Sequence, residues 1–580
     1  MAVELGAYRV LSDGAGAALV APDASIPWWC APRFDSPPLL WSLLDPTGTR
    51  AEVADAMPLD RQQAPAGRTT TTTVETPCGR VEVRDALVDG ALIRLLRCTD
   101  GPLDVVHRCA LGGFDGAART DCREQRLRAA PGCWRGIRID ADGVRDVNAA
   151  SWLERLETAA ADFRAGRHGL RLPHGHKDRV HDSIDVLRAC TFEATGAVVA
   201  AVTTSLPEAP GHDRQFDYRY AWLRDTSLAA SVAALLGRPD LARPALDFLT
   251  TRLGSRLFDA PVFTVDGADV PDEHDVLGVA GWRDSRPVRV GNAAKEQVQY
   301  DALGFVIEAA SVYLQAGGSL DATLWRTVRE VADRVCDEPP GETSGIWELR
   351  KPRPLLCADI GRWIALDRAI WIARGWRPTA RRSRWVAARR ACRESVLSEL
   401  RPDGRLPQAY GGDPDELDAS ALLIVMLRML DRRDPRARAL VEVHLDRLGD
   451  WPWLYRYRPG ADDGFSGVEG AFLPCSWWAV SALAAIGDVD RADHRADALC
   501  RALPRLLSEE VDPDSNGGLG NVPLVWSHME TARALYLTDV ARMRRRWGFL
   551  GLQAWRIAQF VHAKGDVRRA SRSAGGESRE

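Results

Sequence analysis

The residues best suited to acid–base chemistry stand in two short acidic segments that lie far apart in the chain. Glu348 follows Trp347 in a segment bounded by Gly and Pro, and Glu509 and Glu510 are adjacent in the second segment. A carboxyl group beside an indole loses hydration, which raises its pKa and lets it hold a proton near neutral pH. Glu348 is therefore a candidate general acid. Glu509 or Glu510 could serve as the second carboxyl group.

Aromatic and ionic side chains that could bind a sugar accompany both acidic segments. Hydrolysis of a glycosidic bond needs one carboxyl group to protonate the leaving oxygen and another to activate water or attack carbon. Indole faces form platforms for sugar rings, and an Arg/Asp pair can hydrogen-bond to vicinal hydroxyl groups. The candidate substrate-binding residues are Tyr218, Trp222, Arg224, Asp225, Trp282 and Trp347, together with Glu510 if Glu509 is the base. The pattern predicts a carbohydrate site.

The composition is that of a globular protein with more than one structural unit. The chain has 580 residues, of which 46% are hydrophobic and 27% are charged. This length exceeds that of a single ordinary core. The formal net charge of -4 argues against nucleic acid or an anionic membrane as the main partner. A small-molecule substrate is the expected partner, and the sequence leaves the oligomeric state open.

The cysteines and the first residues predict a cytoplasmic protein. The twelve cysteines form no C-x-x-C pair, and scattered thiols suit a reducing compartment. Residues 1–6 lack the basic and apolar regions of a signal peptide. The longest apolar run, 419–427, is too short to span a bilayer. We expect no metal and no cofactor, because the histidines near His174 have no acidic or thiolate partner at ligand spacing.

The hydrophobic pattern changes along the chain and predicts two kinds of domain. Residues 1–150 alternate in short runs punctuated by Gly, Pro and Asp, which indicates an antiparallel β-sandwich. Residues 151–212 are predicted to be a helical linker, and residues 213–562 are almost entirely helical in pattern. Residues 563–580, rich in Arg, Ser and Gly, are predicted to be a disordered tail.

The connections in the helical region alternate between short and long, which defines the predicted architecture. The predicted helices are 217–236, 239–253, 292–316, 320–336, 358–374, 379–400, 415–430, 434–448, 468–486, 489–506, 523–537 and 538–562. Short turns with Gly, Pro or Asp follow the odd-numbered helices, and long loops follow the even-numbered ones. Six helical hairpins in this order indicate a mostly α protein with an (α/α)6 toroid, whose long loops collect on one rim. Glu348 and Glu509 lie in two of these loops and could face each other.

Ordered motifs along nearly the whole chain resemble glycoside hydrolase family 15, the glucoamylase family. The motifs are Pro32–Pro37, Asp217–Asp225, Ser285–Ala294 with Gln297 and Asp301, Gly345–Glu348, Ala365–Ala369, Leu417–Ser420, Glu469–Leu473 and Gly520–His528. The resemblance implies an inverting hydrolase that releases β-D-glucose from a non-reducing α-glucoside end. It implies Glu348 as general acid and Glu509 as general base, with Glu510 as the competitor for the second role. It also implies a glucose subsite formed by Tyr218, Trp222, Arg224, Asp225 and Trp347.

The chain departs from the family pattern at several positions. Pro354–Asp359 stands where bacterial members carry an aromatic or His-containing stretch that ends in Ser-Lys. Leu524 replaces a common glutamine, and Phe305 replaces a usual acidic residue. These changes predict a more apolar rim and a substrate other than long starch chains, such as trehalose or a malto- or isomalto-oligosaccharide.

Two other functions are compatible with the same pattern. The protein could be a sugar-binding or regulatory protein on the same fold, because the Ser-Lys stretch is lost. It could also be an acid–base enzyme of specialised metabolism that acts on a non-starch substrate. Retention of Glu348 and Glu509 favours the glycosidase.

Overall fold

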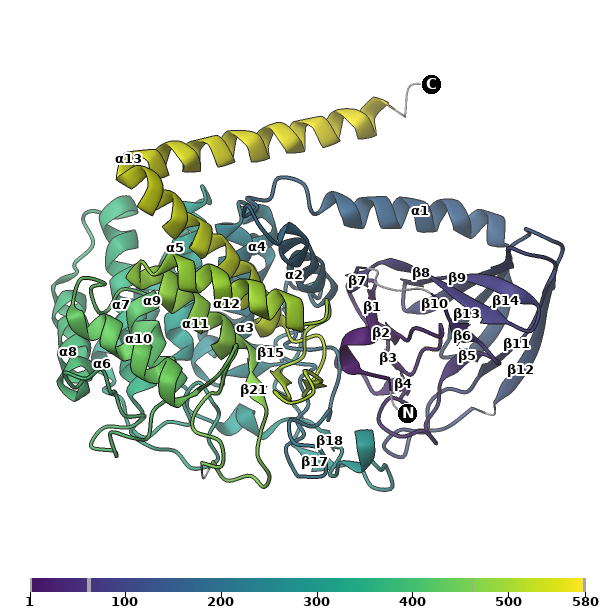
Figure 1. Cartoon of the computed structure of the whole chain (residues 1–580), viewed down its shortest axis with the longest axis horizontal. Helices are drawn as coiled ribbons and strands as arrows, with labels where there is room; N and C mark the ends of the chain where they lie inside the picture. The colour runs from purple at the N-terminus through teal and green to yellow at the C-terminus, as the bar shows by residue number, and fades with distance from the viewer. Residues whose placement is uncertain (1–2, 60–63, 121, 462, 577–580) are drawn as a thin grey trace.

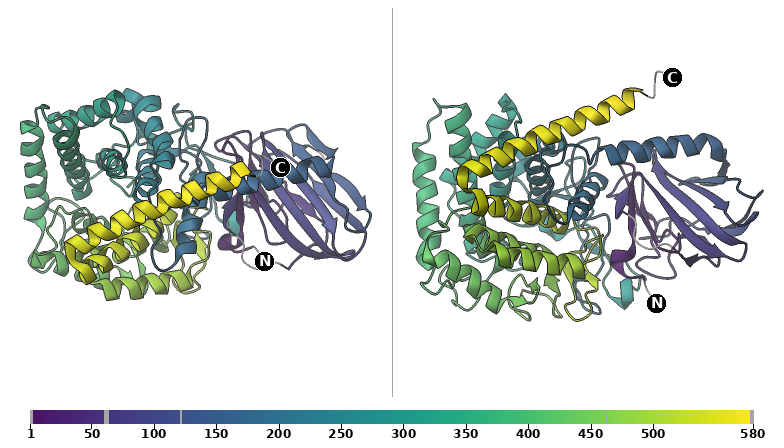
Figure 2. Two further views of the ribbon diagram at one scale, coloured as in Figure 1. Left: turned by 90° about the horizontal axis from the view of Figure 1, so that it is seen from above. Right: turned by 45° about the horizontal axis from the view of Figure 1, so that its top comes forward.

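The computed structural model consists of a sheet-rich N-terminal domain beside a larger helical domain (Figure 1). It describes residues 3–59, 64–120, 122–461 and 463–576, with the side chains at 549, 555–557 and 559–576 left out. The two domains lie side by side in every view (Figure 2). The fold is the (α/α)6 toroid with a preceding β-sandwich that the sequence predicts.

The N-terminal domain is built from short and medium strands whose inward residues form a continuous apolar core. Its strands are β1 (Arg9–Ser12), β2 (Ala17–Val20), β3 (Trp28–Cys30), β4 (Pro38–Leu40), β5 (Ala51–Val53), β6 (Met57–Pro58), β7 (Ala66–Gly67), β8 (Thr69–Thr76), β9 (Gly79–Val88), β10 (Ala91–Cys98), β11 (Leu103–Cys109), β12 (Arg123–Ala129), β13 (Arg135–Asp140) and β14 (Gly143–Val147). They form sheets ordered β4-β3-β2-β1-β7, β14-β13-β10-β9-β8-β6 and β12-β11-β5. The pairing is antiparallel except between β1 and β7. Alternating buried positions, as in β8 and β11, place one face of each strand on the core.

Two helices follow the sandwich in the segment predicted as a linker. Helix α1 (Ala149–Ala165) begins at Asn148, whose side chain accepts a hydrogen bond from the backbone N–H of Ala150. This is the N-cap role that asparagine favours. Helix α2 (Lys177–Ala189) packs against α13, the last helix of the chain. The second linker helix therefore belongs to the wall of the toroid.

The toroid has an inner row of apolar helices and an outer row of amphipathic ones. The inner helices are α3 (Leu223–Leu235), α5 (Ala302–Gln315), α7 (Leu356–Trp376), η6 (Ala419–Leu422) with α9 (Leu423–Met426), α11 (Leu473–Ile486) and the first part of α13 (Val525–Gly576). The outer helices are α4 (Pro239–Asp247) with η2 (Phe248–Leu253), α6 (Ala322–Asp337), α8 (Ser383–Glu399), α10 (Pro435–Arg447) and α12 (Val489–Ala502). Helix α3 packs on both α5 and α13, so the inner row returns to its start. Residues 473–484 of α11 are buried without exception, because both faces of an inner helix contact other helices.

Three helical predictions need correction. The helix predicted to begin at 217 begins at Leu223, and the one predicted from 292 begins at Ala302. The last predicted hairpin, 523–562, is one continuous element, α13, with non-helical angles at Gly548. Because α13 turns outward there, α2 packs on it in the position predicted for the twelfth helix. Helix α13 also runs to Gly576, so the predicted disordered tail is helical over 563–576, and 577–580 lie outside the described residues.

The long connections gather at one edge of the toroid, the lower edge in Figure 1. The short elements in these connections are β15 (Ala221–Trp222), η3 (Gly254–Phe258), β16 (Val262–Phe263), β17 (His274–Asp275), η4 (Trp282–Asp284), β18 (Arg289–Val290), η5 (Ala293–Glu296), β19 (Gly449–Asp450), β20 (Trp453–Leu454), β21 (Ala471–Phe472), β22 (Glu510–Val511) and β23 (Gly518–Leu519). A further short element, η1 (Leu5–Ala7) of the N-terminal segment, contacts β23. Strands β21, β22 and β23 form one antiparallel sheet. The loop that carries Glu509 is thereby tied to the start of α11.

Buried polar contacts join the two domains. The indole N–H of Trp28 donates to the backbone oxygen of Val202 at 2.8 Å. The Arg219 guanidinium donates to the backbone oxygen of Ser36 at 2.8 Å and pairs with Asp217 at 2.7 Å. Arg219 and Asp217 are almost completely buried. The N-terminal domain therefore contacts the segment that leads directly into α3.

None of the described helices combines the length and the apolar character that crossing a membrane requires.

We predict that Asp217→Ala destabilises the protein by about 3–5 kcal/mol, because it leaves the Arg219 charge buried without its carboxylate partner. Thermal unfolding followed by circular dichroism checks this, with Glu394→Ala on the exposed face of α8 as the control. The control removes an exposed ion pair and should leave the midpoint unchanged. An Asp217→Ala midpoint equal to that of the wild type would contradict the prediction.

Candidate active site

Glu348 lies at the end of a tight turn between α6 and α7. Gly345 and Glu348 both adopt left-handed backbone angles, with φ of 64° and 60°. Glycine takes this conformation at little cost, whereas a glutamate does so only when its surroundings fix it. The turn is held by hydrogen bonds from Glu348 N to Gly345 O at 3.2 Å and from Leu349 N to Ser344 O at 2.9 Å. The backbone thus fixes the direction of one glutamate side chain.

Trp347 anchors this turn in the wall of the toroid. Its indole N–H donates to Asp418 Oδ1 at 2.8 Å. Its ring stacks on Trp526 at 6.0 Å between centroids and meets Phe472 edge-on at 5.5 Å. Asp418 also accepts a hydrogen bond from Ser420 N at 2.7 Å. Trp347 is 6% exposed, so it serves as a rigid support as well as a lining residue.

Arg224 is the nearest cation to Glu348. Its guanidinium lies 3.4 Å from Glu348 Oε1, donates to Ile346 O at 2.9 Å and pairs with Asp225 at 3.1 Å. It also lies 4.2 Å from the centre of the Trp526 ring. Burial raises the pKa of Glu348, while the Arg224 charge opposes that shift. Because the effect of burial exceeds that of the Arg224 charge, the Glu348 carboxyl group keeps its proton to higher pH than an ordinary glutamate.

Glu509 immediately precedes β22, and its backbone oxygen accepts a hydrogen bond from Leu473 N at 3.0 Å. Its side chain accepts a hydrogen bond from the Tyr218 hydroxyl at 3.0 Å. The other carboxylate oxygen, Oε2, is buried and has no partner among the described residues. Burial raises the pKa of Glu509 well above its ordinary value, and the nearby Glu208 carboxylate raises it further. Glu509 Oε2 is therefore available to a ligand. Whether the Glu509 carboxyl group is ionised depends on the neighbouring charges.

Glu510 is directed away from Glu509, as expected for successive residues of a strand. Its carboxylate accepts a hydrogen bond from Gly470 N at 2.8 Å and lies 3.4 Å from Arg456. Glu510 is fully buried. Its contacts serve the β21–β22 connection, and it does not line the pocket that contains Glu348.

Glu208 also lines the candidate site, although no sequence motif predicts it. It lies in the loop before α3, and its carboxylate is 3.5 Å from the Tyr218 hydroxyl and 3.3 Å from Arg456. Arg456 also pairs with Glu469. Burial raises the pKa of Glu208, and Arg456 opposes the shift. Its only sequence signal is an acid between prolines, in Pro207-Glu208-Ala209-Pro210.

The structure brings the two candidate catalytic acids into one pocket. Among the sequence-predicted residues, the lining includes Tyr218, Arg224, Trp347, Glu348 and Glu509. Lining residues that the sequence reasoning did not select include Glu208, Phe216, Asn292, Arg456, Phe472 and Trp526. The aromatic members come from the ends of inner helices and the loops beside them.

Four predicted binding residues lie outside this lining. Trp222 packs edge-on against Tyr218 at 5.5 Å, and Asp225 pairs with Arg224, so both support residues that line the pocket. Glu510 faces Gly470. Trp282 is 3% exposed and its ring is covered by Arg283 at 4.0 Å, in a segment held against the N-terminal domain.

The predicted effect of two family departures also needs correction. Phe305 and Leu524 are buried, at 7% and 2% exposure, and neither lines the pocket. They change the packing behind the site and do not make its rim more apolar. In the third departure, Asp359 pairs with Arg362 and accepts a hydrogen bond from the Tyr410 hydroxyl, both at 2.6 Å.

A cluster of three glutamates behind the pocket already surrounds a positively charged side chain, that of Arg456. Carboxylate oxygens of Glu208, Glu469 and Glu510 lie within 4.8 Å of one another. The Arg456 guanidinium contacts all three carboxylates. It supplies the positive charge that such a cluster requires, and we assign no metal there.

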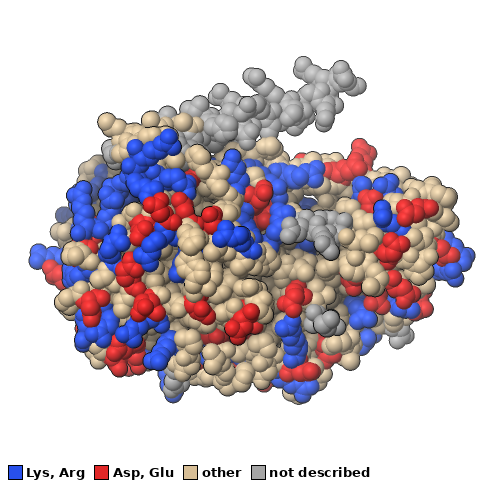
Figure 3. Space-filling view, in the orientation of Figure 1, with Lys and Arg blue, Asp and Glu red and all other residues tan. Residues whose placement is uncertain are grey.

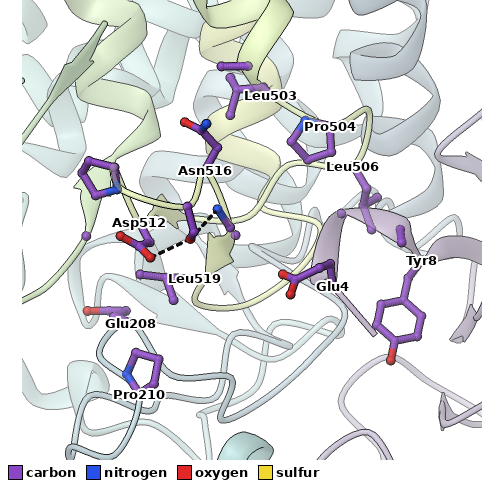
Figure 4. Close-up of a pocket in the computed structure, with 18 of the residues that line it drawn as sticks. Glu4, Tyr8, Glu208, Pro210, Leu503, Pro504, Leu506, Asp512, Asn516 and Leu519 are labelled. Atoms are coloured by element: carbon purple, nitrogen blue, oxygen red, sulfur yellow. Dashed lines mark hydrogen bonds between the residues drawn. The ribbon is translucent and has the colours of Figure 1, made fainter. Parts of the chain in front are cut away.

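A larger pocket of about 1340 Å³ lies between the domains and adjoins the site (Figure 4). Figure 4 shows Glu208, Pro210, Asp512 and Leu519 on one side and Glu4 and Tyr8 on the other. Glu208 lines both this pocket and the one that contains Glu348 and Glu509. It therefore separates the candidate active site from the interdomain space.

A toroid whose long-loop rim buries two carboxyl groups beside stacked aromatic rings has the fold of glycosidases and carries a candidate site for glycoside hydrolysis. The structure is similar in fold to a bacterial glucoamylase solved in complex with acarbose, with a TM-score of 0.60, 14% identity and coverage of 93% of this chain and 94% of that one.

Comparison of the sequence with protein families identifies the chain more closely. Residues 175–495 match the model of glycosyl hydrolases family 15, and residues 1–101 match a trehalase-like N-terminal domain. The chain is 30% identical to a trehalase of Mycolicibacterium smegmatis, over 91% of this chain and 90% of that protein. It is 28% identical to a trehalase of Mycobacterium tuberculosis, over 91% and 88%. The protein belongs to glycosyl hydrolases family 15.

The buried acids predict a pH-dependent effect on stability. Because the pKa of Glu509 is raised in the folded protein, its contribution to stability decreases as pH rises above the ordinary value of about 4.3. Glu509→Gln should therefore raise the thermal midpoint relative to the wild type more at pH 8 than at pH 5. Glu154→Gln, on the exposed face of α1, is the control. Its thermal midpoint should differ from that of the wild type by the same amount at both pH values. A Glu509→Gln gain that grows as pH falls would contradict the assignment of a raised pKa.

Proposed function

We propose that the protein is an inverting α-glucosidase that releases β-D-glucose from the non-reducing end of a small α-glucoside, with trehalose as the first candidate. The observation that carries the proposal is that Glu348 and Glu509 line one pocket. The curated relatives that cover most of the chain are trehalases, which supports trehalose over longer glucans.

Glu348 is proposed as the general acid. It must hold a proton at the start of the reaction and deliver it to the glycosidic oxygen as the bond breaks. Its raised pKa lets it hold a proton to higher pH than an ordinary glutamate, and Arg224 at 3.4 Å stabilises the carboxylate that forms after proton transfer. The left-handed turn fixes the carboxyl group relative to Trp347. These features give Glu348 both a proton and a fixed direction.

Glu509 is proposed as the general base. It must be ionised to accept a proton from the attacking water. Tyr218 donates to Oε1, which leaves the unpartnered Oε2 for that water. Two adjacent buried carboxyl groups do not ionise together readily, so one of Glu208 and Glu509 takes up a proton first. Because the Glu208 charge raises the pKa of Glu509, we propose that Glu509 acts as the base at pH values above that raised pKa.

The aromatic wall is proposed to hold the glucose ring at the bond to be cleaved. Trp347, Phe472 and Trp526 form a contacting group at the pocket, and Trp347 and Trp526 are stacked. Arg224 and Tyr218 supply polar contacts on the same lining. Such a combination of ring faces and charged donors suits a sugar, whose CH groups and hydroxyl groups both need partners.

We predict that Glu348→Gln and Glu509→Gln each lower kcat on trehalose by roughly 10²–10⁴-fold, because each removes one proton-transfer group. Glu510→Gln is the matched neighbour and should lose much less, since an amide can still accept the Gly470 hydrogen bond. Proton NMR of the early products should show one β-glucose and one α-glucose released from each trehalose.

Three results would contradict this proposal. Two α-anomers in the early product would exclude inversion. Faster hydrolysis of long maltodextrins than of trehalose would exclude the proposed substrate. Full activity of Glu348→Gln would indicate a role for this carboxyl group other than acid catalysis.

We also predict that Glu208→Gln moves the acidic limb of the kcat/KM profile to lower pH. The Glu208 charge raises the pKa of Glu509, so its removal lets Glu509 stay ionised in more acidic solution. Activity that needs ionised Glu509 is lost as pH falls through that pKa. The alkaline limb, assigned to Glu348, should stay in place. An acidic limb that is unchanged or moves to higher pH would contradict the coupling between these two glutamates.

A further inference from the structure

The face of the toroid opposite the long loops contains a second pocket, of about 790 Å³. It is formed where α9, α11 and the part of α13 before Gly548 end, beside the short turn between α9 and α10. Its floor is apolar and includes Val425, Met426, Val540 and Ala541. The pocket is therefore separate from both pockets described above.

Arginines surround this pocket, which we call the arginine pocket. The lining arginines are Arg393, Arg428, Arg432, Arg433, Arg544 and Arg545, and the one lining carboxylate among the described residues is Asp431. Figure 3 shows basic side chains gathered at the upper left of the molecule, below the bend of α13. The whole chain has a net charge of -4, so the arginine pocket is a local region of positive charge on a slightly acidic protein.

Most of these arginines are not neutralised by the protein. Arg545 pairs with Asp490 at 2.8 Å, and Arg393 donates to the backbone oxygen of Met429 at 2.9 Å. The guanidinium groups of the other four, Arg428, Arg432, Arg433 and Arg544, have no hydrogen-bond or ion-pair partner within the described part of the chain. The charges of Arg428, Arg432 and Arg433 add to burial in lowering the pKa of Arg544. Arg428, Arg432 and Arg433 are exposed and Arg544 is half-buried, so an anion that lies among them would relieve their mutual repulsion and still be reachable from solvent.

A buried hydroxyl group gives an independent indication of a ligand. Ser481, on α11, lines the pocket with 3% exposure, and its Oγ has no hydrogen-bond partner in the described structure. Leaving a buried hydroxyl unpaired costs free energy. A bound molecule that reaches into the pocket could supply the missing partner. Attraction of arginines to helix C-termini accounts for the Arg393 contact, but it does not account for this hydroxyl group.

We propose that the arginine pocket binds a small molecule that carries two or more phosphate groups. Guanidinium groups bind phosphate oxygens through paired hydrogen bonds, and several unpaired arginines suit more than one phosphate. The hollow shape, the apolar floor and the buried Ser481 hydroxyl favour a small molecule that enters the pocket over a nucleic acid that lies across it. The function of such a site would be separate from the carboxyl chemistry on the opposite rim.

Calorimetric titration of the full chain with pyrophosphate, inorganic phosphate and ATP tests this proposal. We expect pyrophosphate and ATP to bind at least tenfold more tightly than phosphate at 0.15 M salt. The double variant Arg432→Ala/Arg433→Ala should weaken pyrophosphate binding at least tenfold. The single variant Arg544→Gln should also weaken pyrophosphate binding. The matched control is Arg326→Ala/Arg329→Ala, which removes two exposed arginines from α6 and should leave binding unchanged. Hydrolytic activity without added phosphate should be the same in all of these variants.

The proposal is overturned if pyrophosphate fails to bind at millimolar concentration, or if the control pair weakens binding as much as the pocket variants do. It is also overturned if duplex DNA binds and pyrophosphate does not compete with it, because the surface would then recognise a macromolecule. Each variant is first checked by circular dichroism, and Arg544→Gln provides the second reading if the double variant is unfolded.

Discussion

Burial of several carboxyl groups at one rim is the constraint on which the rest of the structure depends. Glu208, Glu348, Glu509 and Glu510 would each ionise freely in water, and each loses hydration in the toroid. Two arginines offset this cost from opposite sides: Arg224 beside Glu348, and Arg456 among the others. Burial still raises the pKa of each of these carboxyl groups, so each keeps its proton to higher pH than an exposed glutamate. Protonated acids are what general acid catalysis requires.

The loops that carry these acids are fixed by contacts with distant elements. The Glu348 turn is anchored through Trp347 to Asp418. The Glu509 segment is anchored through β22 to the start of α11, and Tyr218 joins it to the segment before α3. That segment in turn contacts the N-terminal domain through Arg219. The sheet-rich domain therefore supports the site without supplying its acids.

Much of the architecture could be predicted because helix periodicity and turn residues are local signals. The predicted helix 379–400 encloses α8, and 434–448 encloses α10, each within a few residues. The predictions fail where loops contact the site: the helix predicted from 292 begins at Ala302, because Asn292 caps a short 3-10 turn and Gln297 donates to the Glu348 backbone oxygen. The packing of α2 on α13 is a long-range contact, and periodicity gives no information about it.

Residues of the candidate site could be predicted where acids and aromatic residues stand in dense motifs, but not elsewhere. Glu208 lies in an ordinary Pro-bounded loop, and only folding places it beside Tyr218 and Glu509. Trp282 is the opposite case, because its indole stands in a long loop but is buried outside the lining of the pocket. Glu509 and Glu510 are indistinguishable by composition, and the strand direction separates them.

The most direct test of the central claim is the distance between the Glu348 and Glu509 carboxyl groups in a crystal structure with a glucose-like inhibitor bound. The account predicts a separation of about 6.5–9.5 Å, with a water molecule hydrogen-bonded to Glu509 Oε2 on the face of the sugar ring opposite Glu348. A separation of about 5 Å, or a Glu509 carboxylate directed away from the sugar, would contradict it.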